Sequence, residues 1–399
     1  MSSSGTSLVG VSIPRSGHHY LASLLQAVLG DDLSYCEFYS VQDCCRSVPC
    51  SVGNAARFTY QKGHDLDLTM PVDLTGVLYL VQYRDPVAEA VSDRELFLAA
   101  TGFTTLPSAD QYSHWLAGKT LYYAGFFAKW LRRPIPTVLA VDYERLVGDP
   151  VGVLEEVCLR IGAVRSRDAI QEAVAREAGV VRRPPIAPGG ESRSMDGFVP
   201  RRVEDSPCYQ AEILSEFEAA VLDRVPELSS KRRLPRPEGP PSALSTLVES
   251  AELVAIGDYA GAGRRLADGL ARCPVNAYLH LAAGRLAAAA GGTAASEARA
   301  AFQRAAELSP TDPEILFVLA DAYRSAGETE LAVGVGRRIV AELPGSVGHR
   351  LFYAVLLSEA GRDEDALGEA SHAGQQGITD PHHHELVRQV SERAAQRAR

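Results

Sequence analysis

Three short segments of the sequence carry basic and titratable residues of the types that bind an anion and move a proton. The first, PRSGHHY at residues 14–20, places a basic residue before a glycine turn and a helical pattern. Unpaired backbone N–H groups and the positive dipole end of a helix suit a phosphate there. The GxxxxGK[ST] spacing of a Walker A loop is absent, which disfavours metal–ATP chemistry. An ordinary structural turn is the alternative interpretation.

The second segment, YQKGHDLD at residues 60–67, ends a β-rich run with Lys62 and His64 two positions apart. In a strand this spacing points both side chains to one face, so a cation and a titratable base converge. An unperturbed histidine titrates near pH 6.5, which suits a general base at neutral pH. The alternative is a pair of solvated groups at the end of a strand.

The third segment, VLYLVQYRDPVAEAVSDRELF at residues 77–97, joins a strand pattern to a helix pattern. Arg84 closes the strand, Pro86 falls in the first helical turn, and Ser92 follows the arginine by eight residues. The N-terminus of the helix is therefore anchored next to the arginine. The alternative interpretations are an ion pair at the start of the helix for Arg84 and an ordinary serine on the helix surface for Ser92.

A sheet is needed to bring these segments together. Strand-like runs at 7–13, 58–62, 77–84 and 137–144 alternate with amphipathic helical stretches, which predicts an α/β fold with a parallel sheet. The third and fourth runs are almost continuously apolar, as expected where helices cover both faces of a sheet. Loops at the carboxyl ends of the strands should then carry the site.

A second, all-α domain is predicted after the proline-rich segment RLPRPEGPPSA at 233–243, which can continue neither a helix nor a central strand. Beyond it, a glycine is followed five residues later by an alanine three times, and prolines recur at spacings of 36 and 34. This period resembles the tetratricopeptide repeat (TPR), whose stacked helix pairs form a concave surface and imply a protein partner. The predicted boundaries are 1–232, the linker 233–243, repeats 244–381 and a charged helix or tail 382–399.

Taken in order, PRSGHHY, KGH and RDPVAEAVS resemble the phosphoadenylyl-sulfate (PAPS) dependent sulfotransferases, in which the stretches read like PKSGTTW, KTH and RNPKDVAVS. The resemblance spans residues 7–232 and keeps the Arg-to-Ser offset of eight. Residues 141–163 are also similar to a segment common in bacterial members. The family implies a P-loop-like parallel sheet flanked by helices, and transfer of a sulfuryl group from PAPS to an acceptor hydroxyl, giving PAP and a sulfate ester without a metal.

The resemblance also implies a role for each position. The loop residues would hold the 5′-phosphosulfate end of the donor, Tyr20 would stack on adenine, and Arg84 with Ser92 would bind the 3′-phosphate. His64 would be the general base, while Lys62 and Arg15 would neutralise charge on the transferring group. The loop residues in question are Arg15, Ser16, Gly17, His18 and His19.

The chain departs from the family pattern at several positions. Arg15 stands where cytosolic members have lysine, and its planar fork changes the geometry of the contact. Two imidazoles, His18 and His19, replace hydroxyl residues, and one of them could compete with His64 as the base. The later basic segment of the family's 3′-phosphate site has no clear match; Arg193, Arg201 and Arg202 are the candidates.

Composition limits the partners. The 399 residues are 46% apolar and 23% charged with a formal charge of −10, which argues against wholesale nucleic-acid binding. Without a long apolar run or a leader-like N-terminus, the expected location is cytoplasmic, with no membrane span. The abundance of alanine and arginine suits a GC-rich bacterial genome and favours a glycan or a small natural product as acceptor.

The sequence also contains a cluster of four cysteines and a run of three histidines, and it leaves two other classes of function open. Cys36, Cys44, Cys45 and Cys50 match no standard zinc spacing, so we expect thiols, placed where the acceptor pocket would lie. The run 382–384 of three histidines is expected in a solvated tail. The alternatives to a sulfotransferase are a P-loop small-molecule kinase and a catalytically inactive nucleotide-binding TPR scaffold.

Overall fold

The computed structural model describes residues 6–37, 47–50, 56–72, 74–101, 106–178, 202–290, 294–377 and 381–398. The chain divides into two compact units. The first comprises Met1–Ser108 with Trp115–Gly239, and the second comprises Ala109–His114 with Pro240–Arg399. The division after Gly239 falls inside the proline-rich segment 233–243.

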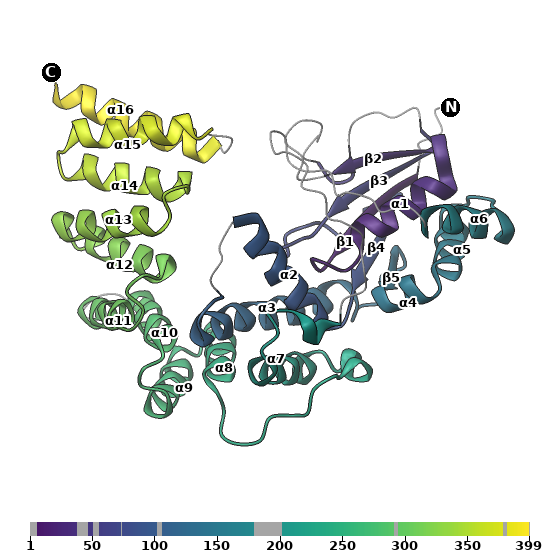
Figure 1. Cartoon of the computed structure of the whole chain (residues 1–399), viewed down its shortest axis with the longest axis horizontal. Coiled ribbons are helices and arrows are strands. Elements are labelled where there is room, and N and C mark those ends of the chain that lie inside the picture. The colour runs from purple at the N-terminus through teal and green to yellow at the C-terminus, as the bar shows by residue number, and fades with distance from the viewer. Residues whose placement is uncertain are drawn as a thin grey trace. The chain divides into compact units, whose positions relative to one another are not determined.

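The first unit contains a five-stranded, all-parallel sheet in the order β2-β3-β1-β4-β5 (Figure 1). Because β3 lies on one side of β1 and β4 on the other, the winding reverses at β1, and a site is expected at its carboxyl end. The parallel sheet confirms the sequence-based prediction, with one addition, the edge strand β2. The strands are β1 (Thr6–Ser12), β2 (Leu33–Glu37), β3 (Phe58–Gly63), β4 (Val77–Tyr83) and β5 (Val138–Asp142).

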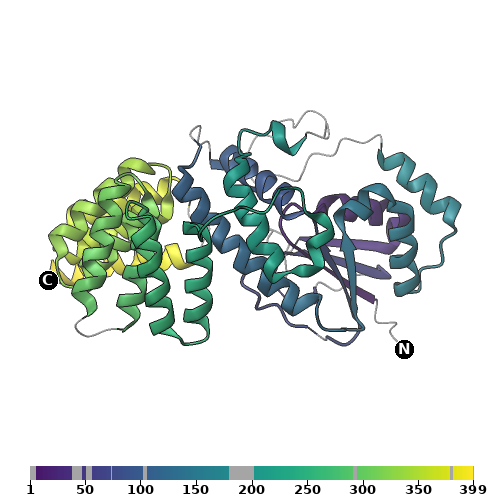
Figure 2. The same ribbon diagram turned by 90° about the horizontal axis from the view of Figure 1, so that it is seen from below.

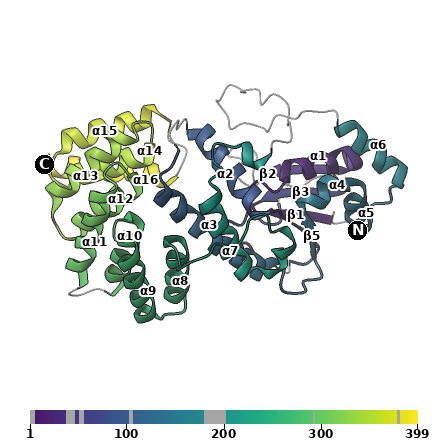
Figure 3. The same ribbon diagram turned by 60° about the horizontal axis from the view of Figure 1, so that its bottom comes forward.

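Helices cover both faces of this sheet. On one face the apolar core joins the strands to α1, α5 and α6, with Leu25, Leu154 and Ile170 buried together (Figure 3). On the other face aromatic side chains of α3 pack on β4, with the rings of Trp130 and Tyr79 5.0 Å apart. The helices are α1 (His18–Leu29), α2 (Pro86–Thr101), α3 (Ala109–Trp130), α4 (Tyr143–Gly148), α5 (Pro150–Ile161), α6 (Arg167–Ala178) and α7 (Ala211–Arg224), with single 3-10 turns η1 (Gly30–Asp32), η2 (Val203–Asp205) and η3 (Pro226–Lys231).

The second unit is an all-helical repeat domain, in which successive helices pack as pairs (Figure 2). A left-handed glycine, such as Gly327 with φ 74°, ends the first helix of a pair. The alanine five residues later, Ala332, is fully buried. The helices are α8 (Ala243–Ala255), α9 (Tyr259–Arg272), α10 (Ala277–Ala290), α11 (Ala294–Leu308), α12 (Pro313–Ser325), α13 (Thr329–Glu342), α14 (Val347–Glu359), α15 (Asp363–Gln375) and α16 (Pro381–Arg397).

The first turn of α3 belongs to the second unit, although the rest of that helix belongs to the first. Asp110 accepts a hydrogen bond of 2.8 Å from the Asn276 side chain at the start of α10. The His114 ring stacks on Tyr278, with centroids 4.1 Å apart. Helix α3 is therefore a shared element, which the sequence pattern did not indicate.

None of the helices in the described part of the chain combines the length and the apolar composition that crossing a bilayer requires.

Candidate functional site

The site is built around the turn that joins β1 to α1. Gly17 has φ 79°, and a Cβ there would lie 2.6 Å from the Tyr143 ring, so both backbone shape and space require glycine. Arg15 also has a left-handed φ of 63°, which is strained for a residue with a side chain. Gln82 at the end of β4 donates to the Ser16 carbonyl at 3.1 Å and fixes the turn. The predicted strand–turn–helix is present.

On one side of the turn, residues from the first and third sequence segments meet. The Arg15 Nε donates to Ser92 Oγ at 3.0 Å, and Arg84 Nη1 donates to the Arg15 carbonyl at 3.0 Å. The Arg84 guanidinium also lies over the Tyr143 ring, 4.3 Å from its centroid. Two cations and a hydroxyl thus gather beside the start of α1. Tyr143 was missed from sequence; its only signal is an aromatic residue directly after a strand's carboxyl end.

This arginine pair has the electrostatics of an anion site. The pKa of Arg15 is lowered from its ordinary value, first because protein atoms desolvate the guanidinium; Asp93 opposes that shift, and the charge on Arg84 adds to it. Ser16 Oγ and Arg84 Nε are buried without a hydrogen-bond partner in the described structure. Buried donors of this kind point to a missing polar ligand or water. The residues present therefore fit a phosphate group.

On the other side of the turn lie Lys62 and His64. Lys62 Nζ lies 2.6 Å from Glu37 Oε1 and 2.9 Å from His19 Nε2. His64 Nδ1 lies 2.9 Å from Ser12 Oγ and 3.0 Å from the Ser12 carbonyl oxygen. Lys62 thus contacts α1, and His64, one position beyond the end of β3 at Gly63, contacts the last residue of β1. That both side chains point to one face stays a prediction. Glu37 comes from β2, so the ion pair of Lys62 could not be anticipated without that strand.

The imidazoles of this side are held neutral. Burial lowers the pKa of His19 to about 4, helped by the charge on Lys62. Burial also lowers the pKa of His64 and brings that of His18 well below its ordinary value. A neutral imidazole can accept a proton at neutral pH, as a general base must.

The structure also describes Tyr20 and part of the cysteine cluster. Tyr20 packs partly buried against the apolar core of the sheet, and its contact with adenine stays a prediction. Cys36 and Cys50 are thiols outside any disulfide, while Cys44 and Cys45 lie outside the described residues.

Of the arginines considered for the 3′-phosphate, Arg193 and Arg201 also lie outside the described residues. Arg202 is exposed, with a 4.0 Å contact to Glu204. The run 382–384 lies in α16, and among the residues the structure describes no cluster of three or more His, Cys, Asp or Glu side chains could hold a metal ion.

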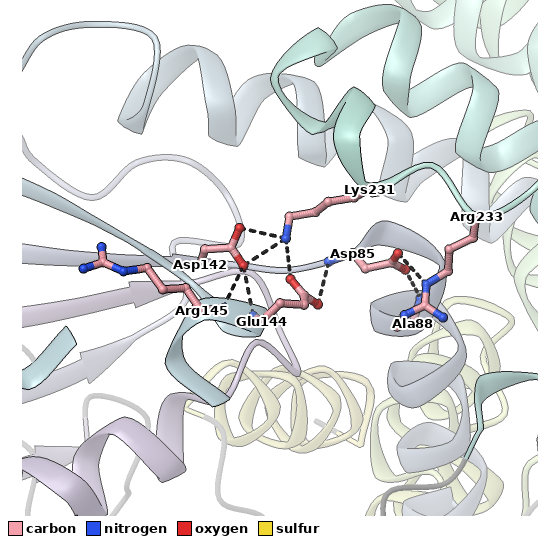
Figure 4. A network of polar contacts seen from close by, with 7 residues as sticks. All are labelled: Asp85, Ala88, Asp142, Glu144, Arg145, Lys231 and Arg233. Atoms are coloured by element: carbon pink, nitrogen blue, oxygen red, sulfur yellow. Dashed lines mark hydrogen bonds and ion pairs between the residues drawn. The ribbon is translucent and has the colours of Figure 1, made fainter. Parts of the chain in front are cut away.

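A second basic segment, KRR at residues 231–233, braces the arginine side (Figure 4). Arg233 Nε donates to Asp85 Oδ2 at 2.6 Å, and Lys231 Nζ lies 2.7 Å from Asp142 Oδ2 and also contacts Glu144. We call these contacts the KRR clasp. Asp85 directly follows Arg84, and the other two acids flank Tyr143, so the clasp holds both members of the Arg84–Tyr143 stack.

The carboxylates of the KRR clasp also cap helices. Asp85 Oδ1 accepts from the Ala88 N–H at 2.7 Å in the first turn of α2, and Asp142 Oδ1 accepts from the Glu144 N–H at 2.9 Å in α4. Each acid therefore joins a helix start to the basic segment 231–233. No local pattern marks this segment, which begins at the last residue of η3 and shortly precedes the prolines.

No protein-family model matches the chain, and no curated protein matches it. Among solved structures, a crystal structure of MamA matches at 16% identity over 38% of this chain and 81% of that chain, with TM-score 0.34. YrrB, a TPR protein with an unusual peptide-binding site, matches at 15% identity over 38% and 81%, with TM-score 0.33. A thermophilic TPR protein from Thermus thermophilus matches at 16% identity over 44% and 89%, with TM-score 0.32. The repeat assignment itself stands on the helix pairs and buried alanines described above.

Proposed function

We propose that the first unit is a PAPS-dependent sulfotransferase with a P-loop-like sheet. The observation that carries the proposal is the meeting of Arg15, Arg84 and Ser92, which come from segments far apart in the sequence, beside the buried Ser16 hydroxyl. These are the positions at which the resemblance implies phosphate contacts. Their convergence favours a ligand that carries a phosphate group, and the resemblance to the family implies that this ligand is PAPS.

The proposed reaction moves a sulfuryl group between two oxygens. The acceptor hydroxyl gives its proton to His64 as a new O–S bond forms to the sulfuryl group. The bond between that sulfur and the bridging phosphate oxygen breaks, and its electron pair leaves with PAP. Lys62, Arg15 and the first N–H groups of α1 are the groups that would stabilise negative charge on the sulfuryl and leaving oxygens.

The ion pair of Lys62 with Glu37 supports this role for the lysine. The 2.6 Å contact keeps a cation beside the imidazole of His19, at the end of the strand that leads to His64. A glycan or a small natural product is the acceptor class we propose, in a cytoplasmic protein. We further propose that the repeats of the second unit bind a protein partner.

The donor site is tested by thermal-shift titration of the whole chain with PAP, AMP and Mg-ATP. A ligand at about 100 times its dissociation constant adds roughly 2.7 kcal/mol to stability, which such a titration detects. We expect stabilisation by PAP without metal and little by AMP. A response to Mg-ATP alone would favour a small-molecule kinase, and no response to any nucleotide would favour a scaffold.

Catalysis is tested by His64→Ala. Removing a general base typically costs about 10²- to 10⁴-fold in rate. We expect PAP release from PAPS, measured with a panel of glycan and phenolic acceptors, to fall by that factor while PAP affinity is kept. Loss of PAP affinity in the variant would instead make His64 a structural residue.

A further inference from the structure

One hydroxyl group in the site is shared by two imidazoles. Ser12 Oγ lies 2.8 Å from His18 Nδ1 and 2.9 Å from His64 Nδ1. Ser12 is 0% exposed and His18 is 5% exposed, so water does not compete for these contacts. A hydroxyl has one proton to donate, and it can serve only one of the two rings at a time.

The backbone of the same residue decides which ring receives that proton. His64 Nδ1 also lies 3.0 Å from the Ser12 carbonyl oxygen, which can only accept. Two lone pairs facing each other at this distance would repel, so the contact favours a proton on His64 Nδ1. A neutral His64 then carries its lone pair on Nε2.

If His64 Nδ1–H donates to Ser12, the hydroxyl oxygen of Ser12 accepts that hydrogen bond. The hydroxyl proton of Ser12 is then donated to His18. His18 Nδ1 accepts it only if that nitrogen is unprotonated. The ring is buried, and desolvation, helped by the charge on Lys62, lowers the pKa of His18 well below its ordinary value and keeps the ring neutral. The proton of His18 therefore sits on Nε2, which has no hydrogen-bond partner in the described structure.

The packing around His18 gives this ring one place to bond. A Cβ on Gly10 would lie 2.5 Å from His18 Nε2 and 2.3 Å from Tyr60 Oη, so the ring fills the space that the glycine leaves. Tyr60 Oη is likewise without a partner in the described structure. The hydrogen bond through Ser12 is thus the one polar contact of the His18 ring that the structure shows.

We propose that His18 is a positioning residue that fixes the tautomer of His64: by taking the Ser12 proton, it leaves the serine oxygen as an acceptor and keeps the His64 proton on Nδ1. The use of His64 Nε2 as a base rests on the proposed sulfuryl transfer. The tautomer of His64 can be measured without PAPS or an acceptor substrate. The inference about His18 and the proposed function can therefore fail separately.

The test is the tautomer of His64, read from the ring ¹⁵N shifts of the histidine-labelled whole chain, with assignment by His64→Gln. In the wild type we expect Nδ1–H and an unprotonated Nε2. His18→Leu frees the Ser12 proton to compete for His64 Nδ1, so a share of the Nε2–H form should appear. His18→Asn places an amide oxygen where Nδ1 was, and should retain the wild-type tautomer.

Ser12 variants separate this account from a general disturbance of the site. Ser12→Ala removes the competing proton but keeps the carbonyl, so His64 should stay Nδ1–H. The double variant with His18→Leu should return to the wild-type tautomer. Ser250→Ala, which removes a buried hydroxyl of α8, is the matched control for folding stability.

Each of the following results would overturn the inference: an Nε2–H form of His64 in the wild type, an unchanged tautomer in His18→Leu, or failure of Ser12→Ala to restore the wild-type tautomer in the double variant. Ser12→Ala and His18→Asn remain informative if His18→Leu does not fold. Loss of the Nδ1–H form in His18→Asn would contradict the acceptor role of His18. A correct tautomer pattern in a protein that shows no transfer would leave the inference standing and refute the proposed function alone.

Discussion

Replacing Arg84 by alanine should weaken PAP binding roughly ten- to a hundredfold while leaving AMP binding nearly unchanged. The Arg84 Nε is buried without a partner in the described structure, while its Nη1 is held by the Arg15 carbonyl. A charge-assisted hydrogen bond from this group to a 3′-phosphate contributes about 1.5–3 kcal/mol. At about 1.4 kcal/mol per factor of ten, that is the expected loss in affinity.

The same substitution should lower the stability of the ligand-free protein only modestly, because its effects partly oppose each other. It removes the stacking of Arg84 on Tyr143, a cation–π contact worth about 0.5–1 kcal/mol, and the hydrogen bond to the Arg15 carbonyl. It also removes the repulsion between Arg84 and Arg15 that helps to lower the pKa of Arg15. The affinity loss can therefore be measured on a folded protein.

The assay is calorimetric titration of wild type and Arg84→Ala with PAP and with AMP, which differ by the 3′-phosphate. Arg167→Ala is the matched control, since Arg167 is an exposed arginine of α6 paired with Glu155. A PAP-to-AMP preference that is the same in wild type and Arg84→Ala would refute the assignment of Arg84. An equal loss of PAP affinity in Arg167→Ala would show that net charge, and not this side chain, is responsible.

Three further perturbations test other parts of the structure. Lys231→Met breaks the KRR clasp and should lower both the melting temperature and PAP affinity, whereas Arg236→Met, which breaks an exposed ion pair, should lower neither appreciably. The pKa of His18 in the folded protein lies below its ordinary value of 6.5, so the unfolded chain takes up a proton first as the pH falls. The free energy of unfolding therefore decreases below about pH 6.5. His18→Asn should therefore lose less stability than wild type between pH 7 and pH 5, by urea midpoints; equal losses would contradict this. A chain ending at residue 239 should fold but show fast amide exchange at 109–114, and an insoluble product would mean that the units depend on each other.

Local patterns in the sequence were enough to predict the repeats and the parallel sheet. In three of the described helix pairs a glycine such as Gly361 adopts a left-handed φ, here 76°, and an alanine such as Ala366 fits a fully buried contact. The requirements for a left-handed glycine and a small buried residue recur at the same spacing, so the repeat can be recognised from the sequence alone. The strand–turn–helix at Gly17 was predictable for the same reason, since it depends on neighbouring residues.

The contacts that complete the site could not be read from the sequence because they join distant segments. Arg15 meets Ser92 only because β1 and β4 are neighbours, an order that no local pattern specifies. The partner of Lys62, Glu37, lies on a five-residue edge strand whose sequence LSYCE is too short for its alternation to stand out. Tyr143 acquires its role from Gly17 and Arg84, and its position directly after a strand is too weak a signal to identify it.

Helix α3 also limits how this chain can evolve by recombination. Its first turn belongs to the second unit and the rest belongs to the first unit. Exchanging the codons after Gly239 for those of another repeat array would leave Asp110 and His114 against foreign side chains. The two units therefore do not recombine as independent modules. Changes at Asn276 or Tyr278 are expected to be matched by changes in the first turn of α3, so that the first unit and the repeats evolve as one lineage.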